Sequence, residues 1–159
     1  MKPVRILFVC LGNICRSPLA EGILRDLAER ASHGRAVSID SAGIGGWHIG
    51  APPDQRSISV AKAHGIDIAA LRGRKITTAD FAAFDLILAM DMSNVRDLSV
   101  LAPAAMAGKV HLFMQYATGR DGDVPDPYYE EAADAFEAVY QMLEAGCLSL
   151  LARLGERAS

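Results

Sequence analysis

The sequence predicts an α/β fold, a three-layer sandwich in which a central four-stranded parallel sheet is flanked by helices. Two observations lead to this prediction. Short apolar runs recur along the chain, and each has the length and hydrophobicity of a strand that is buried on both faces. Between them lie longer stretches whose apolar residues return with the period of a helix, so strands and helices alternate and right-handed crossovers are expected.

Size and composition favour one domain over residues 1–159, because 159 residues with 51% hydrophobic side chains can bury one sizeable core without disulfides or metal. The formal net charge of -3 provides no basic field for nucleic acid or an anionic membrane. The apolar run near the N-terminus is too short for the core of a signal peptide, and no later run reaches the length of a membrane span. We therefore expect a cytoplasmic protein without nucleic-acid or membrane partners.

The three cysteines are an odd number and form no disulfide framework. Cys10 and Cys15 lack the spacing and the His or Cys partners of a zinc site, so no metal is expected. Cys147 lies on the apolar stripe of the last predicted helix, which favours a core residue.

In the first half of the chain we expect a strand over residues 6–9, a helix over 17–32, a strand over 37–40 and a helix over 54–64. Ser17 is the predicted N-cap of the first helix, because Pro18 suits the first helical position. Between the second strand and the second helix, a glycine-rich loop carries Trp47, the only tryptophan. This aromatic side chain fits a half-buried anchor or one wall of a ligand pocket equally well.

In the second half we expect a short helical turn from residue 78, a strand over 85–90, a helix to 101, a strand over 109–113 and a long helix over 130–157. Residues 72–75 are basic and connect two elements, which is typical of solvated surface. Residues 114–127 are polar and broken, and we expect no regular structure there.

The connection between the first strand and the first helix carries the chemistry. Cys10 and Arg16 enclose five residues that include Gly12 and Asn13, the residue types that most readily take positive φ angles. A loop of this kind, backed by a helix N-terminus, points backbone N–H groups at an anion such as phosphate. The same field favours the reactive thiolate of Cys10, and Arg16 can bind two phosphate oxygens at once.

Phosphoryl transfer through a cysteine also requires an acid for the leaving group. Three aspartates qualify by position, Asp40 and Asp91 at strand ends and Asp126 in the polar segment before the last helix. Asp91 also suits a helix cap, and Asp126 precedes a proline, which is typical of a turn. Spacing alone does not choose among the three.

Two motifs, C-L-G-N-I-C-R-S-P at 10–18 and D-P-Y-Y at 126–129, resemble those of the low-molecular-weight protein tyrosine phosphatases, and the resemblance covers essentially the whole chain. It implies a phosphotyrosine-containing protein substrate, inorganic phosphate or another oxyanion as loop ligand, and no cofactor. It also implies a phosphocysteine intermediate in which Cys10 is the nucleophile, Arg16 binds phosphate, and Asp126 protonates the leaving group and then activates water.

The resemblance assigns further residues around these three. The substrate-binding set that it implies is Leu11, Gly12, Asn13, Ile14, Cys15, Ser17, Trp47, Tyr128 and Tyr129. Within it, Ser17 bonds the leaving thiolate and the tyrosines wall the pocket, while Ser41 and Asn94 are supporting residues. One position departs from the family, because Leu71 stands near a histidine that usually joins the hydrogen bonds of the loop. This departure leaves the rigidity of the loop open.

Cys15 has two interpretations, an inward-facing filler or a redox partner that forms a disulfide with Cys10, as the resemblance implies. Among rival functions, an arsenate reductase needs two further cysteines after the third strand, and none lies there. An arginine phosphatase carries threonine where this chain has Ile14. A phosphotyrosine-binding or redox-sensing module needs no acid opposite Cys10, and a nucleotide-binding domain lacks its glycine motifs.

Overall fold

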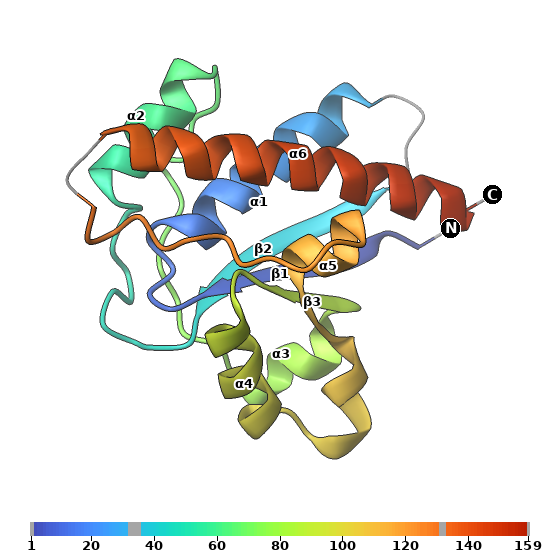
Figure 1. Cartoon of the computed structure of the whole chain (residues 1–159). Coiled ribbons are helices and arrows are strands. Elements are labelled where there is room, and N and C mark those ends of the chain that lie inside the picture. Colours follow the sequence, from blue (N-terminus) through green and yellow to red (C-terminus); the bar gives the residue numbers. More distant parts are fainter. Residues whose placement is uncertain (1, 32–35, 131–132, 159) are drawn as a thin grey trace.

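A four-stranded parallel sheet forms the centre of the protein, in a computed structural model that describes residues 2–31, 36–130 and 133–158 (Figure 1). The strands are β1 (Val4–Cys10), β2 (Val37–Gly43), β3 (Leu86–Ala89) and β4 (Val110–Leu112), in the order β2-β1-β3-β4. The chain moves outward from β1 to β2 and then returns across β1 to β3. The strand order therefore reverses at the carboxyl end of β1, where open α/β sheets bind their ligands.

One face of the sheet is covered by α1 (Arg16–Arg30), α2 (Gln55–Ala63), α5 (Phe113–Thr118) and α6 (Ala133–Ala158). Alternate residues of β1, among them Ile6 and Phe8, point into this layer, and the ring of Phe8 meets that of Phe113 edge to face at 5.5 Å. Cys147 of α6 is fully buried here, which confirms the prediction of a core residue.

The opposite face is covered by α3 (Thr78–Ala83), α4 (Met92–Leu101) and the 3-10 turn η1 (Ala104–Lys109). Leu7 and Val9 of β1 point to this side and pack with Phe81 and Leu98. Because β1 is buried on both faces, its sequence is a continuous apolar run rather than an alternating one. The predicted three-layer sandwich is confirmed.

Two local predictions were wrong. Ser17 does not cap α1, because the helix starts at Arg16 with Cys15 as its N-cap, and the Ser17 side chain turns toward Cys10 instead. The segment predicted to lack regular structure begins with α5, a helix too short for its period to be read from the sequence. The end predicted for the first helix, at residue 32, lies outside the described residues.

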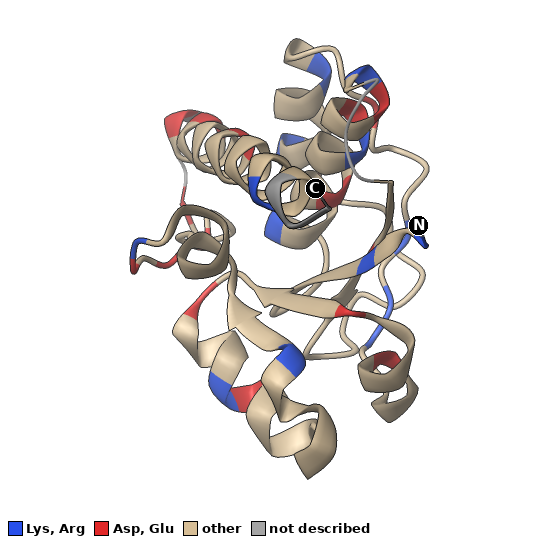
Figure 2. Ribbon diagram, turned by 90° about the vertical axis from the view of Figure 1, so that its right-hand side faces the viewer, with Lys and Arg blue, Asp and Glu red and all other residues tan. Residues whose placement is uncertain are grey.

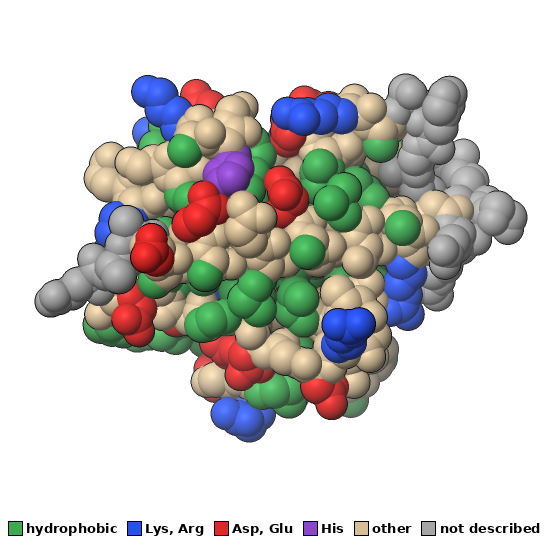
Figure 3. All heavy atoms as spheres, turned by 45° about the horizontal axis from the view of Figure 1, so that its top comes forward, with side chains coloured by type: hydrophobic (Ala, Val, Ile, Leu, Met, Phe, Trp, Pro, Cys, Tyr) green, Lys and Arg blue, Asp and Glu red, His purple; other side chains and the backbone are tan. Residues whose placement is uncertain are grey.

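In the view of Figure 2, charges of both signs are dispersed over the helices and loops of the described residues. On the face seen in Figure 3, acidic and basic side chains are likewise scattered among hydrophobic and uncharged ones. Across the described ranges, no helix is both long enough and apolar enough to cross a bilayer.

Candidate active site

The phosphate-binding loop, residues 10–16, joins the end of β1 to the start of α1. Asn13 has a φ of 58° and is the one non-glycine residue with positive φ in the described part of the chain. Gly12 was expected to share this conformation but does not. Its missing side chain matters for space instead, because a Cβ there would lie 3.2 Å from the ring of His48. A larger residue at 12 would therefore press on the His48 ring, whereas position 13 needs a residue that tolerates the left-handed conformation.

Hydrogen bonds fix the nucleophile candidate. Cys10 Sγ lies 3.0 Å from Ser17 Oγ, and the Asn13 amide donates to that same oxygen at 2.8 Å. Since Ser17 Oγ already accepts this bond, its own proton is available to point at the sulfur. The Cys10 sulfur thus faces a hydroxyl and lies near the N-terminus of α1, which is an arrangement typical of a nucleophilic cysteine.

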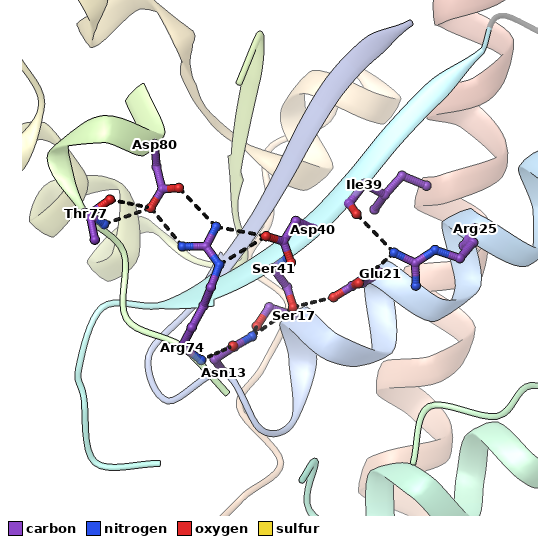
Figure 4. A network of polar contacts seen from close by, with 10 residues as sticks. All are labelled: Asn13, Ser17, Glu21, Arg25, Ile39, Asp40, Ser41, Arg74, Thr77 and Asp80. Atoms are coloured by element: carbon purple, nitrogen blue, oxygen red, sulfur yellow. Dashed lines mark hydrogen bonds and ion pairs between the residues drawn. The ribbon is translucent and has the colours of Figure 1, made fainter. Parts of the chain in front are cut away.

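Asn13 is held on three sides, as Figure 4 shows. Its amide nitrogen also donates to Ser41 Oγ at 3.0 Å, and Ser41 in turn donates to Glu21 at 2.6 Å. Glu21 is only 4% exposed, and Arg25 pairs with it at 2.7 Å. The buried carboxylate is therefore compensated, and the polar chain from Arg25 to Cys10 is continuous.

The third contact of Asn13 comes from the segment predicted to be solvated surface. The backbone N–H of Arg74 donates to Asn13 Oδ1 at 3.0 Å, and its guanidinium forms ion pairs of 3.0 Å with both Asp40 and Asp80 (Figure 4). Arg74 is thus a structural residue that the sequence reasoning missed. Leu71, the departure from the family pattern, packs against the core. The hydrogen bonds of Asn13 to Ser17, Ser41 and Arg74 form without it.

Arg16 is 1% exposed and surrounded by acceptors. Its Nη1 donates to Asp91 at 2.6 Å and to the carbonyl of Val124 at 2.9 Å, and Nη2 lies 3.5 Å from Asp126 Oδ2. Burial lowers the pKa of Arg16, but the charges of Cys10 and the two aspartates outweigh it and raise the pKa above its ordinary value. Nε is buried and has no partner among the described residues. The guanidinium stays charged, and its Nε is a donor left for a ligand.

These groups meet in a cavity of about 420 Å³ at the carboxyl end of β1. Trp47 and Tyr129 stand at its wall with 71% and 82% of their surface exposed. Its lining consists of Cys10, Leu11, Gly12, Ile14, Cys15, Arg16, Trp47, His48, Asp126, Tyr128 and Tyr129. His48 was missed from the sequence, although it directly follows Trp47.

A larger hollow of about 930 Å³ lies at the amino end of β1. Its lining includes Arg5, Lys109 and Arg153 but no cysteine. The smaller cavity is the candidate active site, because it holds the nucleophile candidate and occupies the ligand-binding end of the sheet.

Comparison with known proteins is decisive for the family. Residues 5–159 match the family described as low molecular weight phosphotyrosine protein phosphatase. The chain belongs to this family. The protein-tyrosine-phosphatase YfkJ of Bacillus subtilis is 41% identical over 152 residues, which are 95% of this chain and 96% of YfkJ. The crystal structure of YfkJ matches with a TM-score of 0.89 at 39% identity, over 100% of this chain and 99% of that one.

A second structure, Wzb of Vibrio vulnificus in complex with benzylphosphonate, matches with a TM-score of 0.81 at 35% identity, over 96% of this chain and 100% of Wzb. Membership makes this protein a hydrolase of the protein-tyrosine-phosphatase class.

Within this low-molecular-weight phosphatase, the three candidate acids have different surroundings. Asp40 pairs with Arg74 and does not line the cavity. Asp91 caps α4 by accepting from Asn94 N at 2.8 Å while it holds Arg16. Asp126 alone of the three lines the cavity, with 30% of its side chain exposed, and Tyr128 N donates to its Oδ1 at 3.1 Å.

Two further predicted residues, the supporting residue Asn94 and the substrate-binding residue Cys15, differ in their relation to the cavity. Asn94 is buried on α4, and its Oδ1 has no partner within the described ranges. Cys15 lines the cavity but is nearly buried, and this burial, together with the charge of Asp54, raises its pKa to about 12. Cys15 is therefore a neutral thiol at physiological pH.

Proposed function

We propose that this phosphatase hydrolyses phosphotyrosine in protein substrates through a phosphocysteine intermediate. The observation that carries the proposal is the convergence of Cys10, Arg16 and Asp126 on one cavity with aromatic walls. The cysteine supplies the nucleophile, the arginine the cationic donor and the aspartate the acid. Cys10 and Arg16 belong to one local motif, but Asp126 lies far along the chain, so only the fold brings it to them.

In the first step, the Cys10 thiolate attacks phosphorus and the bond from phosphorus to the tyrosyl oxygen breaks. Asp126 donates its proton to that oxygen, so that a neutral phenol leaves. Arg16 and the backbone N–H groups of residues 10–16 bind the three equatorial oxygens, and the buried Nε of Arg16 is a donor suited to one of them.

In the second step, Asp126, now a carboxylate, takes a proton from water as the water oxygen attacks the phosphocysteine. The bond from sulfur to phosphorus breaks, and Cys10 leaves as a thiolate that Ser17 stabilises across 3.0 Å. Phosphate then departs, and the enzyme has recovered its starting charge and proton. The overall reaction consumes one water and one phosphomonoester.

The substrate assignment rests on the wall of the cavity. Tyr128 and Trp47 offer faces for an aromatic ring, and Ile14 is an apolar side chain where a guanidino group would need a polar one. Wzb of Vibrio vulnificus was solved with benzylphosphonate, an aromatic phosphonate, which supports an aryl phosphate here. We also expect inorganic phosphate to bind the loop and the protein to act in the cytoplasm.

The test is hydrolysis of a phosphotyrosine peptide and p-nitrophenyl phosphate, beside phosphoserine and phosphoarginine peptides, with EDTA present. We expect the wild type to hydrolyse the aryl esters alone and Cys10→Ser to hydrolyse nothing. For Asp126→Asn, we expect the rate on phosphotyrosine to fall by about a hundred-fold or more. Inactivity of the reduced wild type on both aryl esters would refute the proposal. Preference for phosphoarginine would refute the substrate class.

A further inference from the structure

We propose that Arg56 is a positioning residue that holds Asp126 over the phosphate-binding loop. The inference rests on the proposed role of Asp126 as general acid and base. It concerns the Asp126 loop, residues 121–130, which joins α5 to the segment before α6 and contains no helix or strand. A loop without regular structure needs other contacts to place a catalytic carboxylate accurately.

Before Asp126, the loop is attached to the site through Val124. Its N–H donates to the carbonyl of Met90 at 2.8 Å, its carbonyl accepts from Arg16, and its side chain is fully buried. This anchor fixes only one side of Asp126. The residues that follow it, Tyr128 and Tyr129, are exposed by more than a third of their surface.

After Asp126, the anchor is Arg56. Its Nη2 donates to the carbonyl of Tyr128 and its Nη1 to the carbonyl of Glu130, each at 3.0 Å. The guanidinium carbon also lies 4.5 Å from the centre of the Phe136 ring and 5.7 Å from that of Tyr128. One planar side chain thus binds the loop through two backbone oxygens and the ring of Tyr128, and it also packs on Phe136 of α6.

Arg56 is itself attached to the phosphate-binding loop through its neighbour Asp54. The Asp54 carboxylate accepts from Arg56 Nε and Nη2, both at 3.0 Å, and caps α2 by accepting from Arg56 N at 2.9 Å. These bonds from Arg56 hold the pKa of Asp54 below its usual value, so the carboxylate stays ionised. The N–H of Asp54 donates to the carbonyl of Ile14 at 2.8 Å.

The N-terminus of α2 therefore connects the two halves of the active site. Asp54 binds the loop that holds phosphate, and Arg56 binds the loop that holds the acid. Loss of the Arg56 guanidinium removes none of the bonds of Cys10 to Ser17 or of Arg16 to Asp91 and Val124, but it frees the second side of Asp126. A displacement of about 1 Å at a reacting group can reduce a rate on the order of a hundred-fold.

The experiment measures kcat/KM, which reports phosphoryl transfer to Cys10, for two substrates. Phenyl phosphate needs a proton on its leaving oxygen, whereas dinitrophenyl phosphate leaves without one. For Arg56→Gln we expect kcat/KM for phenyl phosphate to fall by about ten-fold or more. We expect kcat/KM for dinitrophenyl phosphate, and inhibition by inorganic phosphate, to stay within about two-fold of wild type, because the phosphate-binding loop is untouched.

Two further variants make the result decisive. Arg56→Lys keeps the charge but cannot donate to two carbonyls and a carboxylate in one plane, so we expect the same selective loss. Arg72→Gln is the matched control and should behave as wild type. Arg72 is exposed, and among the described residues its side chain bonds carbonyls of its own turn, those of Ala69 and Leu71. Equal losses on both substrates, or none, would overturn the positioning role. A wild type inactive on both would instead refute the proposed function.

Discussion

At the scale of single residues, the two cysteines of the phosphate-binding loop line one cavity but differ in chemistry. Cys10 has a hydroxyl donor at 3.0 Å, whereas burial and nearby carboxylates raise the pKa of Cys15 to about 12. Cys15 therefore stays a neutral thiol, and Cys10, the proposed nucleophile, is the expected target of oxidants. Cys147 is fully buried in the core and out of reach.

A redox prediction follows from this difference. Peroxide converts Cys10 to a sulfenic acid, and we expect the Cys15 thiol to condense with it, forming a disulfide and releasing water. The wild type should then regain activity with dithiothreitol, while Cys15→Ser should lose it irreversibly through further oxidation. Activity measured before and after reduction checks this. Equal recovery of both proteins would exclude a protective role for Cys15.

The sequence predicted the site residues that lie in recognisable motifs, but not those whose contacts form only in the folded structure. Cys10 and Arg16 could be named because their residue types and spacing specify the chemistry, whereas Asp126 was chosen from three aspartates only by the family resemblance. Arg56 and Arg74 could not, because they bind backbone carbonyls and carboxylates that only tertiary structure brings close. His48 gave no signal beyond its place next to Trp47.

At the scale of elements, α3 shows how a short helix supports the site. Thr77 and Asp80 form a capping box at its N-terminus, and Asp80 also pairs with Arg74, whose backbone holds Asn13. The sequence predicted a short helical turn from residue 78, but neither the capping box nor the pairing with Arg74 was predicted. Short elements such as α5 were missed for a different reason, because six residues show less than two turns of periodicity.

The α3 cap predicts a pH dependence of stability. Burial raises the pKa of Asp80, but bonds from Arg74 and Thr77 outweigh it and lower the pKa below its usual value. A lowered pKa in the folded state stabilises the fold above the unfolded pKa of about 4, and this contribution is lost as pH falls through the folded value. Asp80→Asn should therefore cost about 2 kcal/mol at pH 7 and much less near pH 3.

Urea unfolding at the two pH values measures this difference. Asp97→Asn is the control, because Asp97 is exposed on α4 and should change stability little at either pH. A cost for Asp80→Asn that is the same at both pH values would contradict the ionic origin of the effect.

At the scale of the whole molecule, the cavity draws together segments that lie far apart in the sequence. The phosphate-binding loop follows β1, Asp91 follows β3, and Val124 and Asp126 precede α6, and all of them converge on Arg16. The parallel sheet makes this convergence possible, because the carboxyl ends of its strands share one edge. The alternation of strands and helices predicted that ligands bind at this edge of the sheet. It did not predict that the Asp126 loop crosses the same edge.

Because a phosphate in the cavity contacts groups that all these segments hold in place, its binding should raise the free energy of unfolding of the whole domain. At a phosphate concentration of 100 times Kd, binding to the folded state alone adds about 2.7 kcal/mol, which corresponds to about 5–10 °C in Tm for a chain of this size. Cys10→Ser and Asp126→Asn should show the same upward shift, since neither removes a phosphate donor. Arg16→Lys should lose most of it, because an ammonium does not reproduce the planar fork. Sodium chloride at matched ionic strength controls for electrostatic screening. A Tm shift of the same size with chloride, or a full phosphate shift in Arg16→Lys, would show that phosphate does not bind the loop.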